Sequence, residues 1–315
     1  MGRYRLGDIV RMTRKSLSIT QEQLSESICS VETLSRIENG SQNPTRDTYE
    51  LLMVRMGRIR SRAYSMLSVS DFQILEKMKQ IEDYIKLYDF IKAETMLNEI
   101  EEKIGESILD QQFKIRVKSS VDYNLKRISL DDYLKESLKA IKLTIPKYGE
   151  ISLSNWPLSS SEAILLTNIA IAYAEKEDFQ NSISLMEEAH SALKQSYMEE
   201  QQRAILQVIV TFNLSKVYGI THNHEKAIEI ADEGIEICRK FKLGNALPYL
   251  IYNIAWNKEK QIEMGVLSPN NKSEAILYLK RAYYIASAMQ MTHMVHFIRE
   301  HIMENFGMID ASFID

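Results

Sequence analysis

Residues 20–40 read TQEQLSESICSVETLSRIENG and predict two short helices joined by a tight turn. Thr20 and Gln23 have the spacing of a capping box, in which each side chain bonds the other residue's backbone N–H at a helix start. Ser30 can cap the second helix, and Gly40 provides the left-handed residue that ends it. Each helix in this stretch therefore carries its own boundary signal.

The flanking residues complete a small helical domain. Leu6, Ile9 and Val10 give a preceding helix one apolar face, and residues 46–56 predict a further helix after a turn at Pro44. We expect these helices to pack together as one unit that covers residues 1–58.

The whole chain is predicted to be all-α. It has 315 residues, with only 11 Gly and 5 Pro, whereas sandwiches and barrels need turn residues every eight to twelve positions. We expect an N-terminal domain at 1–58, a linker at 59–70, a repeat domain at 71–290, and a capping helix with a tail at 291–315.

Charge is distributed unevenly between the N-terminal residues 1–66 and the rest of the chain. Residues 1–66 hold eleven basic and seven acidic side chains, a net charge of +4, so the remaining residues carry −8. A basic N-terminal domain on an acidic body is typical of a small nucleic-acid reader joined to another domain.

Several functional classes find no support in the sequence. No apolar run reaches the roughly 18 residues of a membrane span, so we expect a cytoplasmic protein that does not contact a membrane. Cys29 and Cys238 form neither a disulfide framework nor a zinc spacing. His293, His296 and Glu300 share one helical face, which we interpret as solvated and not as a metal site. We predict no cofactor and no enzymatic activity.

The second half contains a repeat of helix pairs. Asn168, Asn213 and Asn253 each precede an apolar residue and then a small one, and small residues recur at matching offsets in the following helix of each pair. Small residues let helices approach closely. This pattern predicts a superhelix of about five helix pairs, similar to tetratricopeptide repeats.

Because of the motif at 20–40, the first 60 residues or so resemble the Cro/repressor-type helix-turn-helix family. Within that family, residues 25–40 are closer to the PlcR and Rgg branch. Joined to tetratricopeptide-like repeats, the chain resembles the peptide-responsive regulators of quorum sensing, the superfamily of Rap, Rgg, NprR, PlcR and PrgX. The resemblance implies a homodimer that binds near-palindromic double-stranded operator DNA and a short signalling peptide.

In such folds the third helix enters the major groove with its N-terminal side chains against the bases. Arg36 suits guanine or phosphate and Glu32 suits cytosine, although these two side chains could instead pair with each other. Glu38 is expected to make an internal polar contact, because DNA would repel it. The predicted DNA-binding residues are Gln21, Ser30, Val31, Glu32, Thr33, Arg36, Asn39, Arg11, Arg14, Lys15 and Arg46.

The three repeated asparagines are candidates for peptide binding. A carboxamide can bond both the C=O and the N–H of an extended peptide without reading its sequence. The alternative is a purely structural role, since Asn in this register and aromatic residues at helical spacing often serve packing. The predicted groove consists of Asn168, Asn213, Asn253, Ile164, Thr167, Ile171, Phe212, Lys216, Tyr249, Tyr252, Trp256 and Lys260.

We therefore predict a transcription regulator in which a short, largely apolar peptide changes operator binding or activation allosterically. Two alternatives remain open at this stage. One is a phage-type repressor without a small ligand, and the other is a scaffold whose groove holds a protein tail. A sensing-type phosphatase would need a catalytic constellation that the sequence does not supply.

Overall fold

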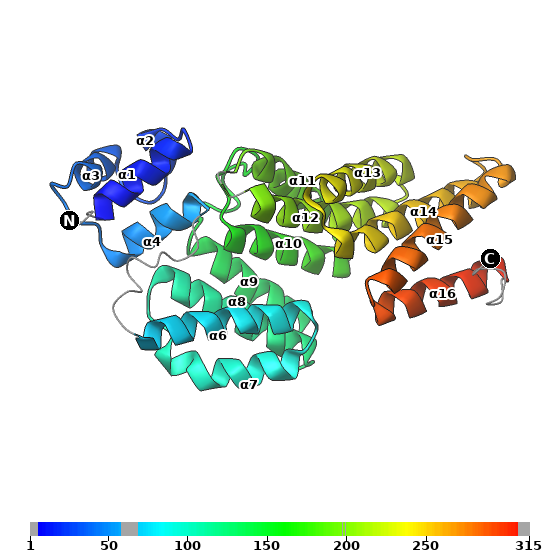
Figure 1. Ribbon diagram of the computed structural model, residues 1–315, viewed down its shortest axis with the longest axis horizontal. Helices are drawn as coiled ribbons and strands as arrows, with labels where there is room; N and C mark the ends of the chain where they lie inside the picture. Colours follow the sequence, from blue (N-terminus) through cyan, green and yellow to red (C-terminus); the bar gives the residue numbers. More distant parts are fainter. Residues whose placement is uncertain (1–5, 58–68, 197, 199, 308–315) are drawn as a thin grey trace. The chain divides into compact units, whose positions relative to one another are not determined.

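The computed structural model describes residues 6–57, 69–196, 198 and 200–307, and this part of the chain is almost entirely helical (Figure 1). Over these residues the structure has no β-strand, only an isolated bridge between Tyr148 and Ile151, which confirms the all-α prediction. The linker predicted at 59–70 falls largely outside the described residues, and the four domain boundaries stay predictions.

The first four helices form the head, the name we use for residues 6–57. They are α1 (Leu6–Ser16), α2 (Gln21–Ser25), α3 (Val31–Glu38) and α4 (Arg46–Arg55). Apolar side chains from all four helices meet in one core, in which Val10, Leu24, Leu34 and Leu52 have no exposed surface.

The boundary signals of the head act as predicted. Thr20 Oγ1 accepts from Gln23 N at 3.2 Å and Gln23 Oε1 accepts from Thr20 N at 2.8 Å, which completes the capping box of α2. Ser30 Oγ accepts from Thr33 N at 3.1 Å and caps α3. Gly40 has φ +79° directly after α3, where residues with a side chain are strained.

A glycine in α1 lets two helices cross closely. A Cβ on Gly7 would lie 1.8 Å from the carbonyl oxygen of Ile37, so any larger residue would push α1 away from the end of α3. This contact fixes how the C-terminal end of α3 lies against α1.

The helices after the head continue as antiparallel pairs. Their bounds are α6 (Val69–Lys86), α7 (Phe90–Ile100), α8 (Ile108–Asn124), α9 (Leu130–Lys142), α10 (Ser160–Glu175), α11 (Phe179–Lys194), α12 (Glu200–Ile220), α13 (His224–Phe241), α14 (Leu247–Glu263), α15 (Lys272–Ala288) and α16 (Thr292–Phe306). Short 3-10 turns occur at Glu101–Lys103, Gly244–Ala246 and Pro269–Asn271.

The chain divides into two compact units. Unit 1 comprises residues 1–176 and 191–199, and unit 2 comprises residues 177–190 and 200–315. Within unit 1 the head is followed by the pairs α6–α7 and α8–α9 and by α10. Within unit 2 the pairs α12–α13 and α14–α15 pack in sequence, and α16 packs against α15.

Small residues bring the helices of unit 2 together, as the repeat predicts. Ala231, Ala255 and Ala282 have no exposed surface and lie in the shared core. A Cβ on Gly234 would lie 2.7 Å from Thr211 Oγ1 and 2.9 Å from Leu250 Cδ2. The small residues at the repeat offsets are therefore contact points between helices.

Candidate functional site

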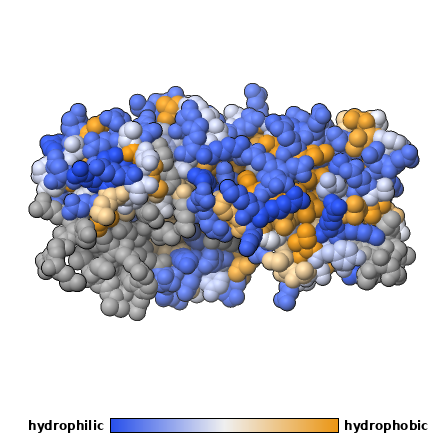
Figure 2. All heavy atoms as spheres, turned by 45° about the horizontal axis from the view of Figure 1, so that its top comes forward, coloured by the Kyte–Doolittle hydropathy of each residue, from blue (hydrophilic) through white to orange (hydrophobic). Residues whose placement is uncertain are grey.

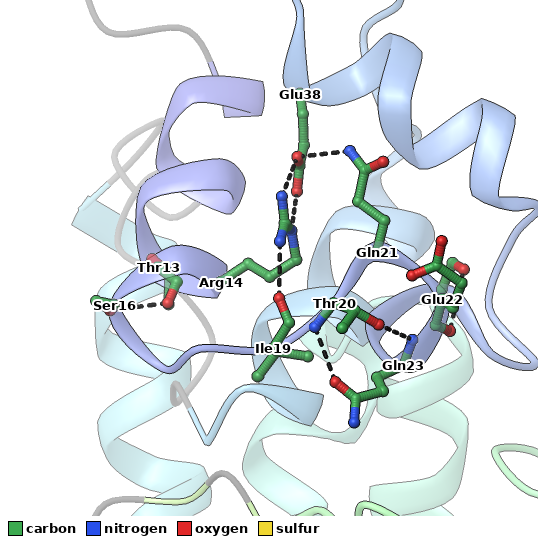
Figure 3. Close-up of polar contacts among 10 residues, drawn as sticks. Thr13, Arg14, Ser16, Ile19, Thr20, Gln21, Glu22, Gln23 and Glu38 are labelled. Carbon is green, nitrogen blue, oxygen red and sulfur yellow. Dashed lines mark hydrogen bonds and ion pairs between the residues drawn. The ribbon is translucent and has the colours of Figure 1, made fainter.

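A buried ion pair joins the helices of the head (Figure 3). Arg14 donates to Glu38 through Nε at 2.6 Å and Nη2 at 2.7 Å, and through Nη1 to the carbonyl of Ile19 at 2.7 Å. Gln21 Nε2 donates to the same carboxylate at 2.8 Å. The internal contact predicted for Glu38 is confirmed. Arg14 was predicted to contact DNA, but its side chain is 11% exposed and its guanidinium holds α1 and α3 together.

This network determines the charge state of its members. Burial by itself would raise the pKa of Glu38, but hydrogen bonds from Arg14 and Gln21 and the charges of Arg14 and Arg11 outweigh it and lower the pKa. The hydrogen bond to Glu38 raises the pKa of Arg14 in return, against the effect of burial. The pair is therefore held in its charged form, the strong form of such a contact.

A hollow of about 640 Å³, the basic hollow, opens beside this network, between α1, α2 and the end of α3. Its lining holds the cations Arg11, Arg14 and Lys15 and the acids Glu22 and Glu38, so the cations exceed the acids by one. Arg11 and Lys15 line it with exposed side chains, and Gln21 and Asn39 contribute amides. Cations and amides around the N-terminus of α2 form a setting suited to a phosphate group. Four of the residues predicted for DNA thus share one surface.

The exposed face of α3 carries the predicted base-reading residues. Ser30, Glu32 and Arg36 are exposed, whereas Val31 and Thr33 are partly buried. Arg36 Nη2 donates to Thr33 Oγ1 at 3.3 Å, so its observed contact is not the predicted alternative with Glu32. Hydrogen bonds from its own backbone N–H and from Ser30 lower the pKa of Glu32, which keeps an acceptor at the start of α3.

The two remaining predicted contacts at the head already have protein partners. Asn39 Oδ1 accepts from the hydroxyl and the backbone N–H of Ser41, at 2.6 and 3.0 Å. Arg46 Nε pairs with Glu50 Oε1 at 2.8 Å, although the Arg46 side chain is 59% exposed. Both residues stay predictions for phosphate contact.

The groove residues predicted on α10 belong to unit 1. Ile164, Asn168 and Ile171 are partly buried and lie on one face of the helix, three or four residues apart. Thr167, also predicted for the groove, is 4% exposed, and its hydroxyl donates to the carbonyl of Ala163 at 2.8 Å. It belongs to the packed side of α10.

Unit 2 brings the larger part of the predicted groove together on α12 and α14. The rings of Phe212 and Tyr249 meet edge to face at 5.5 Å between centroids. Lys260 Nζ lies 5.7 Å from the ring centroid of Trp256 and pairs with Glu263 at 2.7 Å. Figure 2 shows apolar atoms gathered over the later helices on one face of the molecule.

Sequence reasoning missed two exposed apolar residues on α12. Ile205 is 44% exposed and Ile209 is 40% exposed, and they precede Asn213 by two turns and one turn on the same face of α12. Lys216 continues that face as an exposed cation. The helical spacing from Asn213 was the signal that could have identified both isoleucines.

The asparagines of unit 2 differ despite their common register. Asn213 is partly exposed, and its Nδ2 donates to the carbonyl of Ile209 at 2.8 Å. Asn253 is 8% exposed, and its Nδ2 lies 3.3 Å from the carbonyl oxygen of Phe212 and 3.4 Å from Ser215 Oγ. Asn253 was predicted for the groove, and in this structure its amide links α14 to α12 inside the unit.

Tyr252, predicted for the groove, contacts the C-terminal helix α16. Its ring packs against Phe297 at 4.9 Å, and its hydroxyl lies 3.0 Å from His301 Nδ1 on α16. His301 Nε2 in turn lies 2.9 Å from Glu259 Oε2. Tyr252 thus joins α14 to the C-terminal helix, whereas Tyr249 pairs with Phe212 on α12.

Among the residues that the structure describes, no group of three His, Cys, Asp or Glu side chains could hold a metal ion. His296 pairs with Glu300 at 3.2 Å on the exposed face of α16. None of the described helices combines the length and apolar character that a membrane crossing requires.

Comparison with known proteins assigns the head to a family. Residues 10–58 match the helix-turn-helix family model. No curated protein has a significantly similar sequence. The fold of the whole chain, however, matches several solved structures.

PlcR of Bacillus thuringiensis in its apo form is 19% identical, with a TM-score of 0.61 over 94% of this chain and 98% of that chain. PlcR in complex with the peptide PapR7 and DNA is also 19% identical, with a TM-score of 0.59 over 94% and 99%. Apo ComR of S. thermophilus is 14% identical, with a TM-score of 0.54 over 95% and 98%. The predicted resemblance is confirmed at the level of the fold: residues 10–58 are a helix-turn-helix domain, and the chain as a whole has the fold of the regulators PlcR and ComR.

Proposed function

We propose that the protein is a transcription regulator that binds operator DNA through its head as a homodimer and binds a short, largely apolar peptide on α12 and α14. The observation that carries the DNA-binding part is the combined surface of the head. The exposed face of α3 and the basic hollow beside α2 provide base-reading and phosphate-binding groups on one small domain.

The peptide part rests on the open face of α12. Ile205, Ile209 and Phe212 offer apolar contacts, and Asn213 keeps a partly exposed amide among them. Lys216 places a cation at one end of this row, which suits a peptide carboxylate or an acidic side chain. An exposed apolar row with one amide and one cation supports binding of an extended peptide. The solved complex of PlcR with a peptide and DNA supports the same combination.

The first test is selection of DNA by the full-length protein from a pool of random-sequence duplexes. We expect selected duplexes to contain two related half-sites about one helical turn apart or a multiple of it, because a two-fold dimer presents two α3 helices. Failure to select any sequence would contradict the DNA-binding part of the proposal.

The second test is a thermal-shift titration with short apolar peptides encoded beside the gene. A peptide at a hundred times its dissociation constant stabilises the protein by roughly 2.7 kcal/mol, which is readily visible as a melting shift. We expect the shift in the wild type and in Asn98→Ala, a control at an exposed position of α7, and its loss in Asn213→Ala. No shift with any of these peptides would favour a repressor without a small ligand or a scaffold for a protein tail.

A further inference from the structure

Arg55 is a buried cation at the end of the head. It is the last residue of α4 and is 5% exposed. Its Nη1 donates to the carbonyl of Glu26, the residue that caps the C-terminus of α2. The guanidinium carbon lies 5.0 Å from the ring centroid of Trp156, which belongs to the segment that precedes α10. One side chain therefore contacts α2, α4 and the repeat part of unit 1.

The segment that holds Trp156 is unusual for a connection between helices. Residues 143–159 link α9 to α10 without a regular element, yet Leu153, Trp156 and Leu158 are at most 6% exposed. Long irregular connections usually run over the surface, and those that do not tend to have a function. The indole N–H of Trp156 is buried and has no hydrogen-bond partner in the described part of the chain. What Trp156 contributes here is its ring, which Arg55 covers.

Burying the Arg55 charge requires compensation. Burial lowers the pKa of Arg55, and the charges of Glu162 and Glu26 oppose that effect. Glu162 is itself 3% exposed and is fixed in the capping box of α10, where Ser159 N donates to its Oε2 at 2.8 Å. A planar guanidinium that stacks on an aromatic ring and bonds a carbonyl is well suited to such a buried contact.

A second contact ties the same helix to the repeats. Ser107 Oγ, at the N-cap of α8, lies 3.3 Å from Glu50 Oε2 on α4 and 2.7 Å from Asp110 Oδ2. Glu50 and Asp110 are 4% and 1% exposed. Helix α4 is thus held at its middle by α8 and at its end by the Trp156 segment.

These contacts leave the predicted DNA surface of the head uncovered within unit 1. Glu32 and Arg36 on α3, and Arg11 and Lys15 on α1, are all exposed. Arg55, by contrast, is buried against Trp156, and it contacts Glu26 only through the backbone carbonyl. The head is therefore docked through one side and presents another side to solvent. Such docking orients the DNA surface and does not block it.

We propose that Arg55 and Trp156 form a clamp that fixes the orientation of the head on the first repeats, which makes Arg55 a positioning residue for the binding of two DNA half-sites at once. This inference rests on the proposed function as a dimeric DNA-binding protein. When two linked domains bind together, the affinity rises by a factor of about 100 to 10,000 without any new contact, and the gain is lost when their geometry is not maintained. The clamp maintains that geometry.

The test compares a duplex with two half-sites, taken from the selection above, with the same duplex reduced to one half-site. Fluorescence anisotropy is measured with the full-length protein at one salt concentration. For Arg55→Ala we expect about a hundredfold weaker binding to the two-site duplex and a change within about twofold on the single site. Arg55→Lys, which keeps the charge but loses the planar group, should have an intermediate effect.

Trp156→Phe keeps an aromatic face and should retain most of the two-site affinity, whereas Trp156→Ala should behave like Arg55→Ala. Arg239→Ala, at an exposed site on α13, controls for the loss of one positive charge. A variant that merely unfolds the head would lose single-site binding as well, which would contradict a positioning role. Equal two-site affinity in the wild type and Arg55→Ala would overturn the clamp and leave the proposed function intact. If the protein selected only duplexes with one half-site, or selected no duplex, both the clamp and the proposed function as a dimeric DNA-binding protein would be overturned.

Discussion

The head and the repeats of unit 2 bury polar side chains for different purposes. In the head, Arg14, Gln21 and Glu38 form a charged network that joins α1, α2 and α3. In unit 2, Asn253 forms uncharged contacts at 3.3 and 3.4 Å between α12 and α14, beside an apolar core in which alanines lie among larger aliphatic residues. A small domain has few apolar residues to bury, so specific polar contacts matter more to its architecture. In the repeats, close packing at small residues fixes how the helices lie against one another.

The largest expected effect tests the charged network of the head. Arg14→Ala leaves Glu38 buried without its cation and should cost about 3 kcal/mol or more in the free energy of unfolding of the head. Chemical denaturation, combined with hydrogen exchange of the α1 and α3 amides, measures the loss. Arg11→Ala, at an exposed position next to the network, should change stability by no more than about 0.5 kcal/mol. Equal effects of the two substitutions would contradict the structural role of Arg14.

The same network predicts a pH dependence. Because the pKa of Glu38 is lowered in the folded head, its stabilising contribution is complete above the ordinary carboxyl value of about 4.3 and is lost as the pH falls through the lowered value. Glu38→Gln should be less stable than the wild type at neutral pH and should lose less stability on acidification. A parallel acid dependence of the two proteins would contradict this assignment.

The next effect is on the affinity and base preference that Arg36 of the head gives to DNA binding. Arg36→Ala should weaken binding to the selected duplex by about 1–3 kcal/mol and relax the preference at one base position. Anisotropy titration against duplexes substituted at each position measures both changes. Uniform weakening on every sequence would instead assign Arg36 to a phosphate.

A smaller effect distinguishes the two asparagines of unit 2. Asn253→Ala removes a buried amide between α12 and α14 and should cost about 1 kcal/mol in stability. Asn213→Ala should leave stability within about 0.5 kcal/mol and abolish the peptide-induced melting shift. If Asn253→Ala lost peptide binding without any loss of stability, the division between packing and ligand residues would be wrong.

The smallest effect is electrostatic. Lys15→Ala should lower the slope of log affinity against log salt concentration by about one, because one phosphate contact is lost. Binding measured at four salt concentrations gives the slope. An unchanged slope would place Lys15 outside the DNA interface.

The parts of this fold that were predictable from sequence are local. The capping box at Thr20, the cap at Ser30 and the left-handed Gly40 each depend on residues within a few positions, and all three were confirmed. The repeat of small residues in unit 2 was visible for the same reason, since each helix carries its own offset pattern.

What sequence reasoning missed depends on contacts between distant residues. Arg14 pairs with a residue 24 positions away, and its basic character alone suggested DNA. Asn213 and Asn253 share a register, but only the second faces a neighbouring helix closely enough to be buried. The Arg55–Trp156 contact joins α4 to an irregular segment that no periodic pattern describes.

We propose that one chain contains a DNA-reading head and a separate peptide-binding face that controls it. The most direct measurement is the affinity of the full-length protein for the selected two-site duplex, with and without the peptides encoded beside its gene. We predict that at least one peptide changes this affinity in the wild type and leaves Asn213→Ala unaffected. An affinity that no peptide changes, or an equal change in Asn213→Ala, would contradict the account.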